Sequence, residues 1–337
     1  MRTCGKKRNI VVRYLLRRLV GWLVMIFVAT NITYFLANFY LSPRSNYLGR
    51  RPPIPEATIN VALSQYNLND HDPLLSRWWT WLSGILLHWN WGYSPIGDSV
   101  NEQIGFRVWI SGELVLGATV ILTVVGIALG VYTASRQYKL SDRVAQGTSI
   151  ITLNIPVVVA ALGIVLLAIK VNQATGSTVF YVVGAANTGV TGLGHIAADR
   201  LQHLILPTVV LVLTGYAGIH FLQRSLLLDT IGADYVRTAR AKGLTKSQAI
   251  RRHALRTSLI PVATQIAFSI PALFTGAVLT ESIFGWEGMG RYFATTLRTN
   301  DVHGVVATAA FGALMTAIGA ILADIAIVVL DPRVRVH

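Results

Sequence analysis

The sequence is poor in charged residues and in cysteine. Only 13% of its 337 residues are Asp, Glu, Lys or Arg, and 53% are hydrophobic. A soluble protein of this size carries about a quarter charged residues. The single cysteine, Cys4, excludes an intramolecular disulfide. This composition predicts a membrane protein.

Motifs for catalysis and nucleotide binding are also lacking. No phosphate-binding loop of the form Gly-x-x-x-x-Gly-Lys-Ser/Thr occurs. The eight histidines include no His-Glu-x-x-His or other dense ligand cluster, and His253 is interpreted as a packing or capping residue. No nucleophile–base pair stands out, which disfavours an intramembrane hydrolase. We therefore expect no enzymatic activity, no metal and no cofactor bound by this chain.

Long windows without charge indicate the spans, because a helix needs about 20 residues to cross the hydrocarbon core. Residues 171–198 are rich in Gly, Thr and Asn and are expected to form a loop. Residues 78–97 hold five of the eight tryptophans and are expected to form an interfacial helix. We predict an all-α integral membrane protein with six transmembrane helices, in windows 19–43, 114–135, 144–169, 201–223, 257–280 and 302–323.

The distribution of Lys and Arg predicts the orientation, since these residues resist translocation. With the N-terminus inside, the cytoplasmic segments hold 20 of the 29 basic residues. Both termini are therefore expected in the cytoplasm, with an extended extracytoplasmic loop after the first helix. The net charge of +14 lies beside the spans, which favours topology and contact with membrane lipid over binding of nucleic acid. The first helix is expected to be a retained anchor.

Two sections follow from these spans. Residues 1–111 are predicted to form the anchor helix and the extracytoplasmic loop, and residues 112–337 a core of five helices with a cytoplasmic loop at 224–256. The outer loop begins with the proline-rich stretch 51–55, which is unsuited to a helix. The rest of this loop, through Trp109, is expected to form one or two short helices on the membrane.

Helix breakers lie inside several windows. Asn154-Ile155-Pro156 interrupts the third, Pro207 lies in the fourth, and Pro261 and Pro271 lie in the fifth. Proline leaves a carbonyl that needs another partner or a water-lined cavity, so the pattern is compatible with a transport pathway and equally with kinked packing helices. Charged residues are almost absent near mid-span. This disfavours an autonomous channel or secondary carrier, which would require a titratable relay.

The loop at 224–256 carries the signals of a helix–turn–helix. Asp234 is favourable at a helix N-terminus, and Gly243 is suited to a left-handed C-terminal cap. The run from Thr245 to Gln248 matches a capping box that begins a second helix, directed through His253 toward the membrane. Small and long cationic side chains on the first helix suit docking into a groove of another protein; a solvated charged loop is the alternative.

The segment 234–244 resembles the cytoplasmic "EAA" loop of permease subunits of ATP-binding-cassette importers, in the form of the peptide and nickel branch (OppB/DppB type). The resemblance covers residues 112–335 approximately, and residues 13–18 and 89–93 match more loosely. The other matching motifs are Leu204–Pro207, Gly276–Leu279, Glu281–Gly285, Gly288–Arg291 and Asp331–Arg333.

The resemblance implies a multi-pass permease of the bacterial cell membrane that takes up oligopeptides or dipeptides; nickel, oligosaccharide and glutathione stay open as substrates. The implied partners are a second homologous permease, one or two ATPases that bind ATP and Mg, and an extracytoplasmic substrate-binding protein. The coupling helix would be 234–243. The residues expected to contact the ATPase are Asp234, Tyr235, Val236, Arg237, Thr238, Ala239, Arg240, Ala241, Lys242, Gly243 and Leu244. The expected pathway or gate residues are Asn154, Pro156, Thr275, Thr280, Glu281 and Arg291.

Overall fold

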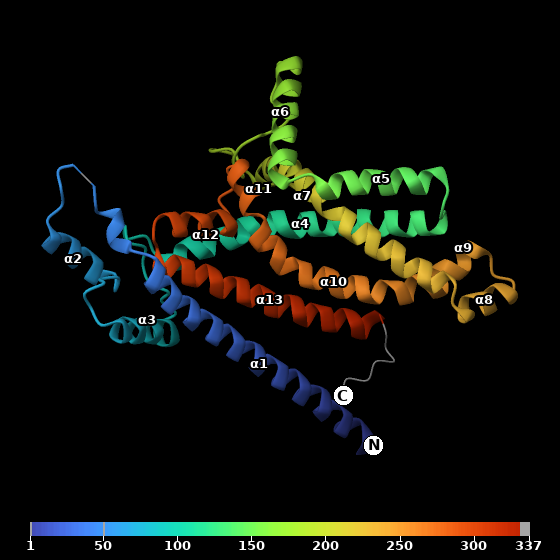
Figure 1. The fold of residues 1–337 in the computed structure, drawn as a ribbon, viewed down its shortest axis with the longest axis horizontal. Helices are drawn as coiled ribbons and strands as arrows, with labels where there is room; N and C mark the ends of the chain where they lie inside the picture. Colours follow the sequence, from blue (N-terminus) through green and yellow to red (C-terminus); the bar gives the residue numbers. More distant parts are fainter. Residues whose placement is uncertain (1, 50, 331–337) are drawn as a thin grey trace. The chain divides into compact units, whose positions relative to one another are not determined.

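In the computed structural model, the regular secondary structure of the described residues consists of helices (Figure 1). Outside the helices, the β pairing within these residues is one isolated bridge between Tyr93 and Ser99. The predicted all-α class is therefore confirmed. The structure describes the backbone of residues 2–49 and 51–330, and the side chains of these residues except 2–16, 270–276 and 328–330. The side chains of Cys4 and Thr275 and the motif 331–333 therefore lie outside the described residues.

The chain folds as two compact units. Among the described residues, the first comprises those up to Ser111 together with Glu287–Ala317, and the second comprises Gly112–Trp286 and those from Ile318 on. The sequence placed residues 287–317 in the core section, whereas the structure groups them with the N-terminal section. The physical reason is apolar burial, since Val302, Val305 and Val306 belong to the first unit's hydrophobic cluster.

The first unit is built around aromatic and aliphatic side chains. Tyr34 and Trp81 stack with their ring centroids 4.5 Å apart, and Leu63 is fully buried beside them. The proline-rich stretch 51–55 is non-helical and two short helices follow it, as predicted. The unit contains α1 (Arg2–Tyr40), η1 (Pro43–Asn46), α2 (Glu56–Gln65), α3 (Leu74–His88), α12 (Met289–Arg298) and the first parts of α4 (Val100–Ser135) and α13 (Val302–Leu330).

One expectation about the outer loop is wrong. Residues 100–109 were assigned to the loop and its surface helices, but they form the first turns of α4. Glu102 lies in the first turn, where a carboxylate is favourable against the helix dipole. No proline separates this stretch from the apolar window that begins at residue 114, so the helix continues through it.

In the second unit, the long helix α7 (Leu193–Ile231) packs against α5, α6 and α10 (Figure 1). It also touches α4 closely, because a side chain at Gly130 would meet Cβ of Gln223 at 2.7 Å. The other helices are α5 (Leu140–Asn154), α6 (Val157–Thr175), α8 (Asp234–Ala241), α9 (Lys246–Ala249), the π-helical η2 (Ile250–Ala254), α10 (Leu255–Gly276) and α11 (Val278–Ile283).

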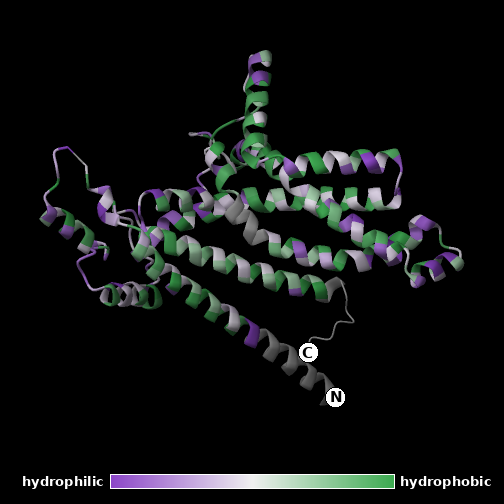
Figure 2. Cartoon of the chain, in the orientation of Figure 1, coloured by the Kyte–Doolittle hydropathy of each residue, from purple (hydrophilic) through white to green (hydrophobic). Residues whose placement is uncertain are grey.

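Five helices among the described residues are long and apolar enough to cross a membrane, and each overlaps a predicted window. Figure 2 shows the hydrophobic residues along them. They are Arg17–Tyr40, Val100–Ser135, Val157–Thr175, Leu193–Ile231 and Val302–Ile327. The sixth window, 257–280, overlaps α10 and the start of α11.

Proline ends a helix in one of the predicted apolar windows and is accommodated within a helix in two others. The third window is split between α5 and α6, as predicted, because Ile155 before Pro156 is extended with ψ of 119°. The helices α7 and α10 instead continue through Pro207 and Pro261. The predicted loop at 171–198 is narrower than expected, since α6 extends to Thr175 and α7 begins at Leu193.

Candidate functional site

The helix predicted at 234–243 is α8, and its C-terminus has the predicted geometry. Gly243 has φ of +94°, a left-handed conformation that glycine adopts without a steric penalty. Its amide donates to the carbonyl of Arg240 at 3.0 Å, and the amide of Leu244 donates to Ala239 at 3.3 Å. These two bonds form a Schellman cap and end the helix at Ala241.

The predicted capping box is also present. The amide of Gln248 donates to Thr245 Oγ1 at 3.3 Å, and the Thr245 amide donates to Gln248 Oε1 at 3.1 Å. From here α9, the π-helical segment and α10 follow each other directly. The side chain of His253 is exposed on this run, which contradicts a packing role within this chain and leaves the capping role as a prediction.

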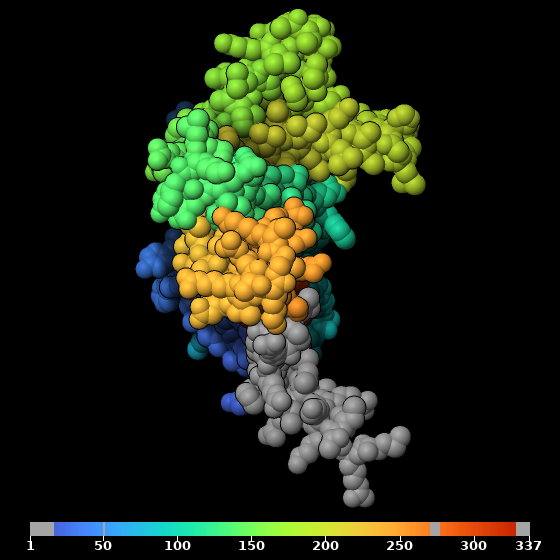
Figure 3. All heavy atoms as spheres, turned by 90° about the vertical axis from the view of Figure 1, so that its right-hand side faces the viewer, coloured from blue at the N-terminus to red at the C-terminus, as the bar shows by residue number. Residues whose placement is uncertain are grey.

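The helix α8 is attached through two small apolar side chains. Val236 and Ala239 are buried in a cluster that also contains Leu227 of α7 and Ile250 of the π-helical segment. This end of the second unit faces the viewer in Figure 3. The exposed residues on α8 and its cap are Asp234, Tyr235, Arg237, Thr238, Arg240, Ala241, Lys242 and Gly243.

The exposed side chains of α8 are only weakly tied to the rest of this chain. The ion pair between Asp234 and Arg237 is 3.8 Å long, and the two side chains are 98% and 73% exposed. Water screens such a pair almost completely, so it adds little stability. The face therefore presents small residues and long cations that are free to contact another protein.

A buried ion pair joins α5 to α7 near the same end. Arg224 Nε and Nη2 donate to the two carboxylate oxygens of Asp142, each at 3.0 Å, and Asp142 is 1% exposed. The backbone amide of Tyr138 donates to the same carboxylate at 2.9 Å. The guanidinium of Arg224, and after it this amide, hold the pKa of Asp142 below its usual range.

A second polar group lies one turn away on α7. The ring of His220 contacts Thr133 Oγ1 of α4 through Nε2 at 3.1 Å and Ser149 Oγ of α5 through Nδ1 at 2.8 Å. Sequence reasoning missed this group because it counted only Asp, Glu, Lys and Arg. The available signal was the spacing of Tyr216, His220 and Arg224, which repeats every four residues and places them on one face of a helix.

The predicted pathway residues belong to several elements of the two units. Asn154 and Pro156 are exposed at the break between α5 and α6, and Asn154 Nδ2 donates to its own helix at Ile150. Thr280 and Glu281 are fully buried on α11 in the same unit. Arg291 belongs to the first unit, where it pairs with Glu287 at 2.7 Å, and the Thr275 side chain lies outside the description.

The second unit contains a cavity that sequence reasoning did not find. It has a volume of about 500 Å³ and lies between α4, α7 and α10. Gln265 and Ser269 line it from α10, and their spacing of four residues inside an apolar window is the signal that was available. No group of three or more potential metal ligands occurs among the described residues. The complete lining is Leu122, Gly215, Gly218, Ile219, Leu222, Gln265, Ile266 and Ser269.

Comparison with known proteins gives consistent matches. Residues 126–336, which include α8 and most of the cavity lining, match the family described as binding-protein-dependent transport system inner membrane component. The oligopeptide transport system permease protein OppB of Mycobacterium tuberculosis is 39% identical over 325 residues, 96% of this chain and 99% of the relative.

Two further relatives are more distant. The oligopeptide transport system permease protein AppB of Bacillus subtilis is 33% identical over 286 residues, 84% of this chain and 87% of the relative. The dipeptide transport system permease protein DppB of Escherichia coli K12 is 30% identical over 273 residues, 74% of this chain and 80% of the relative. The similarity thus extends over most of the chain.

Proposed function

The chain belongs to the family of inner-membrane components of binding-protein-dependent transport systems, and from this premise we propose that it is the permease subunit of an ATP-binding-cassette importer for oligopeptides or dipeptides. Peptide as the substrate is supported by the names of the relatives, which include an oligopeptide permease 39% identical over 96% of this chain. A second, homologous permease completes the pathway. Partner ATPases bind ATP and Mg, and an extracytoplasmic binding protein delivers the substrate.

The proposed topology has six spans, with α10 as the fifth in order along the chain. Both termini then lie in the cytoplasm and the loop after α1 lies outside. This orientation is supported by the excess of Lys and Arg in the segments that it assigns to the cytoplasm, including eight in residues 224–256. It places α8 on the side where ATP is available.

The exposed face of α8 carries the proposal for energy coupling. Only Val236 and Ala239 are buried on this helix, and the other side chains are available to an ATPase cleft. The same two buried side chains pack against Leu227 of α7 and Ile250 before α10. A displacement of α8 by the ATPases is therefore transmitted directly to two helices that line the cavity.

The cavity between α4, α7 and α10 is the proposed part of the pathway in this chain. The amide of Gln265 can donate and accept hydrogen bonds, and the hydroxyl of Ser269, which donates to the carbonyl of Ile266 at 2.7 Å, can accept them. Such groups pair with the backbone of any peptide, whatever its side chains. Asn154, Pro156, Thr275, Thr280, Glu281 and Arg291 stay candidates for the gate or the remaining pathway.

Site-directed cross-linking tests the coupling assignment. In a Cys4→Ser background, Ala241→Cys should cross-link to the ATPase because Ala241 is exposed on α8. Ala249→Cys is the matched control, since Ala249 is 0% exposed in the adjoining cluster. No cross-link from position 241, or equal cross-linking from both positions, would contradict docking on this face.

Two substitutions test its importance for transport. Ala241→Arg adds a long cation to the exposed face, and Gly243→Pro imposes a φ of about −65° where the chain has +94°. Both should abolish ATPase docking and peptide uptake while the chain still inserts. Thr175→Arg, an exposed position at the end of α6, should leave both unchanged. ATPase binding at wild-type strength in both coupling variants would refute the assignment.

An autonomous channel is the competing function, and a vesicle flux assay separates it from the permease. Labelled peptide should enter vesicles only when both permeases, the ATPases and ATP are present. Unlabelled peptide should compete for uptake, whereas nickel and glutathione should not. Robust uptake by the chain alone would overturn the proposal.

A further inference from the structure

The turn between α4 and α5 lies at the same end of the second unit as α8 (Figures 1 and 3). It comprises residues 136–139 and is closed by the amide of Lys139, which donates to the carbonyl of Arg136 at 3.0 Å. Ala134, two residues before it, belongs to the buried cluster that attaches α8. The turn and α8 are therefore neighbours on one surface, which the proposed topology places in the cytoplasm.

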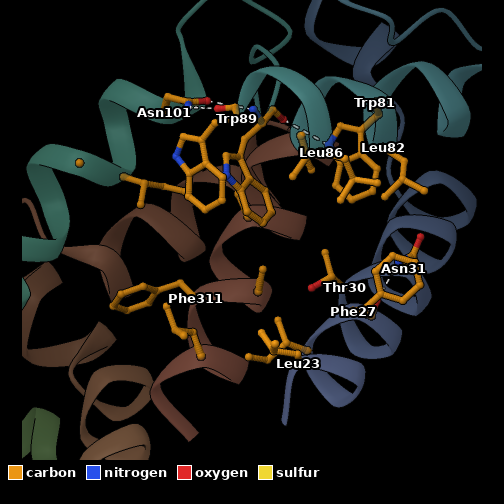
Figure 4. Close-up of a pocket in the computed structure, with 18 residues that line it drawn as sticks. Leu23, Phe27, Thr30, Asn31, Trp81, Leu82, Leu86, Trp89, Asn101 and Phe311 are labelled. Carbon is orange, nitrogen blue, oxygen red and sulfur yellow. Dashed lines mark hydrogen bonds between the residues drawn. The ribbon is translucent and has the colours of Figure 1, made fainter. Parts of the chain in front are cut away.

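Tyr138 has an uncommon conformation in this turn. Its φ is +67°, in the left-handed region that residues with a side chain seldom adopt. Its side chain is 74% exposed. By contrast, Trp81 of α3, which lines an apolar cavity of the first unit (Figure 4), is 4% exposed and stacks on Tyr34. The chain thus presents the Tyr138 ring outward in a backbone conformation that costs free energy, and such positions concentrate at functional sites.

The buried ion pair between Asp142 and Arg224 holds the turn in this conformation. The amide of Tyr138 donates to Asp142 Oδ2 at 2.9 Å, and the same oxygen accepts from Arg224 Nη2 at 3.0 Å. At the start of the turn, Arg136 Cζ lies 4.3 Å from the centre of the Tyr132 ring of α4. The turn is therefore ordered before a partner binds, which lowers the entropic cost of binding.

The side chains around Tyr138 combine apolar and cationic groups. Leu140, the first residue of α5, is 77% exposed. Lys139 and Arg143 are exposed beside it, whereas the carboxylate of this stretch, Asp142, is 1% exposed and paired. Tyrosine and arginine are enriched among the residues that dominate protein interfaces, and a surface that receives these cations is acidic.

The exposed face of α8 is too small to hold an ATPase by itself. A specific protein interface uses roughly 20–30 residues on each side, and α8 with its cap exposes eight. The exposed residues that follow, between 245 and 253, are polar or charged. We propose that the turn 136–139 and the first turn of α5 form a second contact with the partner ATPase, and that Tyr138 fills an apolar pocket with an acidic rim on it. This inference rests on the proposed function, because it takes α8 as the first contact.

The membrane surface is the other environment that suits aromatic and cationic side chains. A fluid headgroup layer accommodates a tyrosine ring in many orientations, whereas a pocket on a protein requires one. The fixed left-handed backbone of Tyr138 and the continuity of the turn with α8 favour the ATPase as the occupant.

Photo-cross-linking in the assembled transporter tests the contact and separates the two occupants. Benzoylphenylalanine is placed at position 138, at position 241 on α8, or at position 153, which is 53% exposed on α5 and serves as the control. Positions 138 and 241 should label the ATPase, and position 153 should not. Labelling of the ATPase from 241 but only of lipid from 138 would overturn the second contact and leave the proposed function intact. Labelling from neither position would overturn both.

Two substitutions separate the ring of Tyr138 from its backbone conformation. Tyr138→Gly removes the ring, and glycine adopts a φ of +67° without strain, so the variant should insert and unfold at nearly the wild-type temperature. Its affinity for the ATPase, measured by titrating the reconstituted permease pair with purified ATPase, should fall about tenfold, as expected for the loss of an aromatic anchor. Tyr138→Phe keeps the ring and should retain wild-type affinity. Wild-type affinity in Tyr138→Gly would overturn the proposal.

Discussion

At the scale of single residues, the second unit contains a buried ion pair between Asp142 and Arg224. Both carboxylate oxygens accept from the guanidinium at 3.0 Å, and the carboxylate is 1% exposed. The two residues are 82 positions apart in the chain. The pair therefore ties α5 to α7 close to the end where α8 is attached.

Removing one partner should be strongly destabilising. Asp142→Asn leaves the Arg224 guanidinium without its counter-ion in a largely buried position, and such a loss costs about 3 kcal/mol. We expect a clear drop in the thermal unfolding temperature. Asp70→Asn is the matched control, because Asp70 also pairs with an arginine but is 52% exposed, so its loss should cost less than about 1 kcal/mol. Equal drops in the two variants would contradict this account.

The same pair predicts a pH dependence. Arg224 lowers the pKa of Asp142 in the folded state below that of the unfolded chain. The ion pair thus contributes fully above the unfolded pKa of about 3.9 and is lost as the pH falls through the lower folded value. The difference in unfolding temperature between the wild type and Asp142→Asn should be constant from about pH 8 to pH 5 and shrink below about pH 4. A decline already between pH 8 and 6 would show that another group is responsible.

At the scale of elements, the contact between α4 and α7 depends on two glycines four residues apart. A Cβ on Gly126 would meet Ile219 Cβ at 2.7 Å, and one on Gly130 would meet Gln223 Cβ at 2.7 Å. Small residues at this spacing let two membrane helices approach closely. The approach also brings Thr133 within hydrogen-bond distance of His220.

Replacing glycine by alanine should change the stability of the protein differently at two positions of α4. Gly130→Ala forces α4 away from α7, and overpacking of this kind costs about 1–3 kcal/mol. Gly117→Ala meets no atom within 4 Å and should be neutral or stabilising, since alanine is the better helix former. Thermal unfolding of the two variants measures the difference. Destabilisation by Gly117→Ala equal to that by Gly130→Ala would indicate that close approach is not the cause.

At the scale of the whole molecule, the proposed topology has measurable consequences. The chain has one cysteine, Cys4, so Cys4→Ser provides a cysteine-free background. A cysteine at position 241 should react with an impermeant thiol reagent only from the cytoplasmic side, and one at position 64 or 188 only from outside. Ser64 and Thr188 are exposed in the structure, so low reactivity there cannot result from burial. Labelling of positions 64 and 241 from the same side would exclude six spans with both termini inside.

Local signals account for much of what could be predicted from the sequence. Apolar windows located the five helices that are able to span the membrane, because length and composition alone decide whether a helix can do so. Gly243 and the Thr245–Gln248 pair located the ends of α8 and α9, because a cap depends on neighbours within a few residues. The break before Pro156 followed from the covalent geometry of proline.

The contacts between distant segments could not be predicted in this way. The Asp142–Arg224 pair, the His220 group and the burial of Thr280 and Glu281 depend on which helices become neighbours. The gate residues were chosen by residue type, because the sequence alone does not show which helices become neighbours. The cavity beside Gln265 and Ser269 needed three helices to be placed together before it could be found.

The sequence by itself determined that this protein is a helical membrane protein, where α8 ends and α9 begins, and which loop presents a capped, cationic helix. Only the tertiary structure decided that Val236 and Ala239 attach this helix to α7 and to the π-helical segment before α10, and that residues 287–317 pack with the N-terminal section. The physical reason is the distance along the chain over which each interaction acts. Hydropathy and capping act over a few residues, whereas burial and ion pairing join residues far apart in the chain.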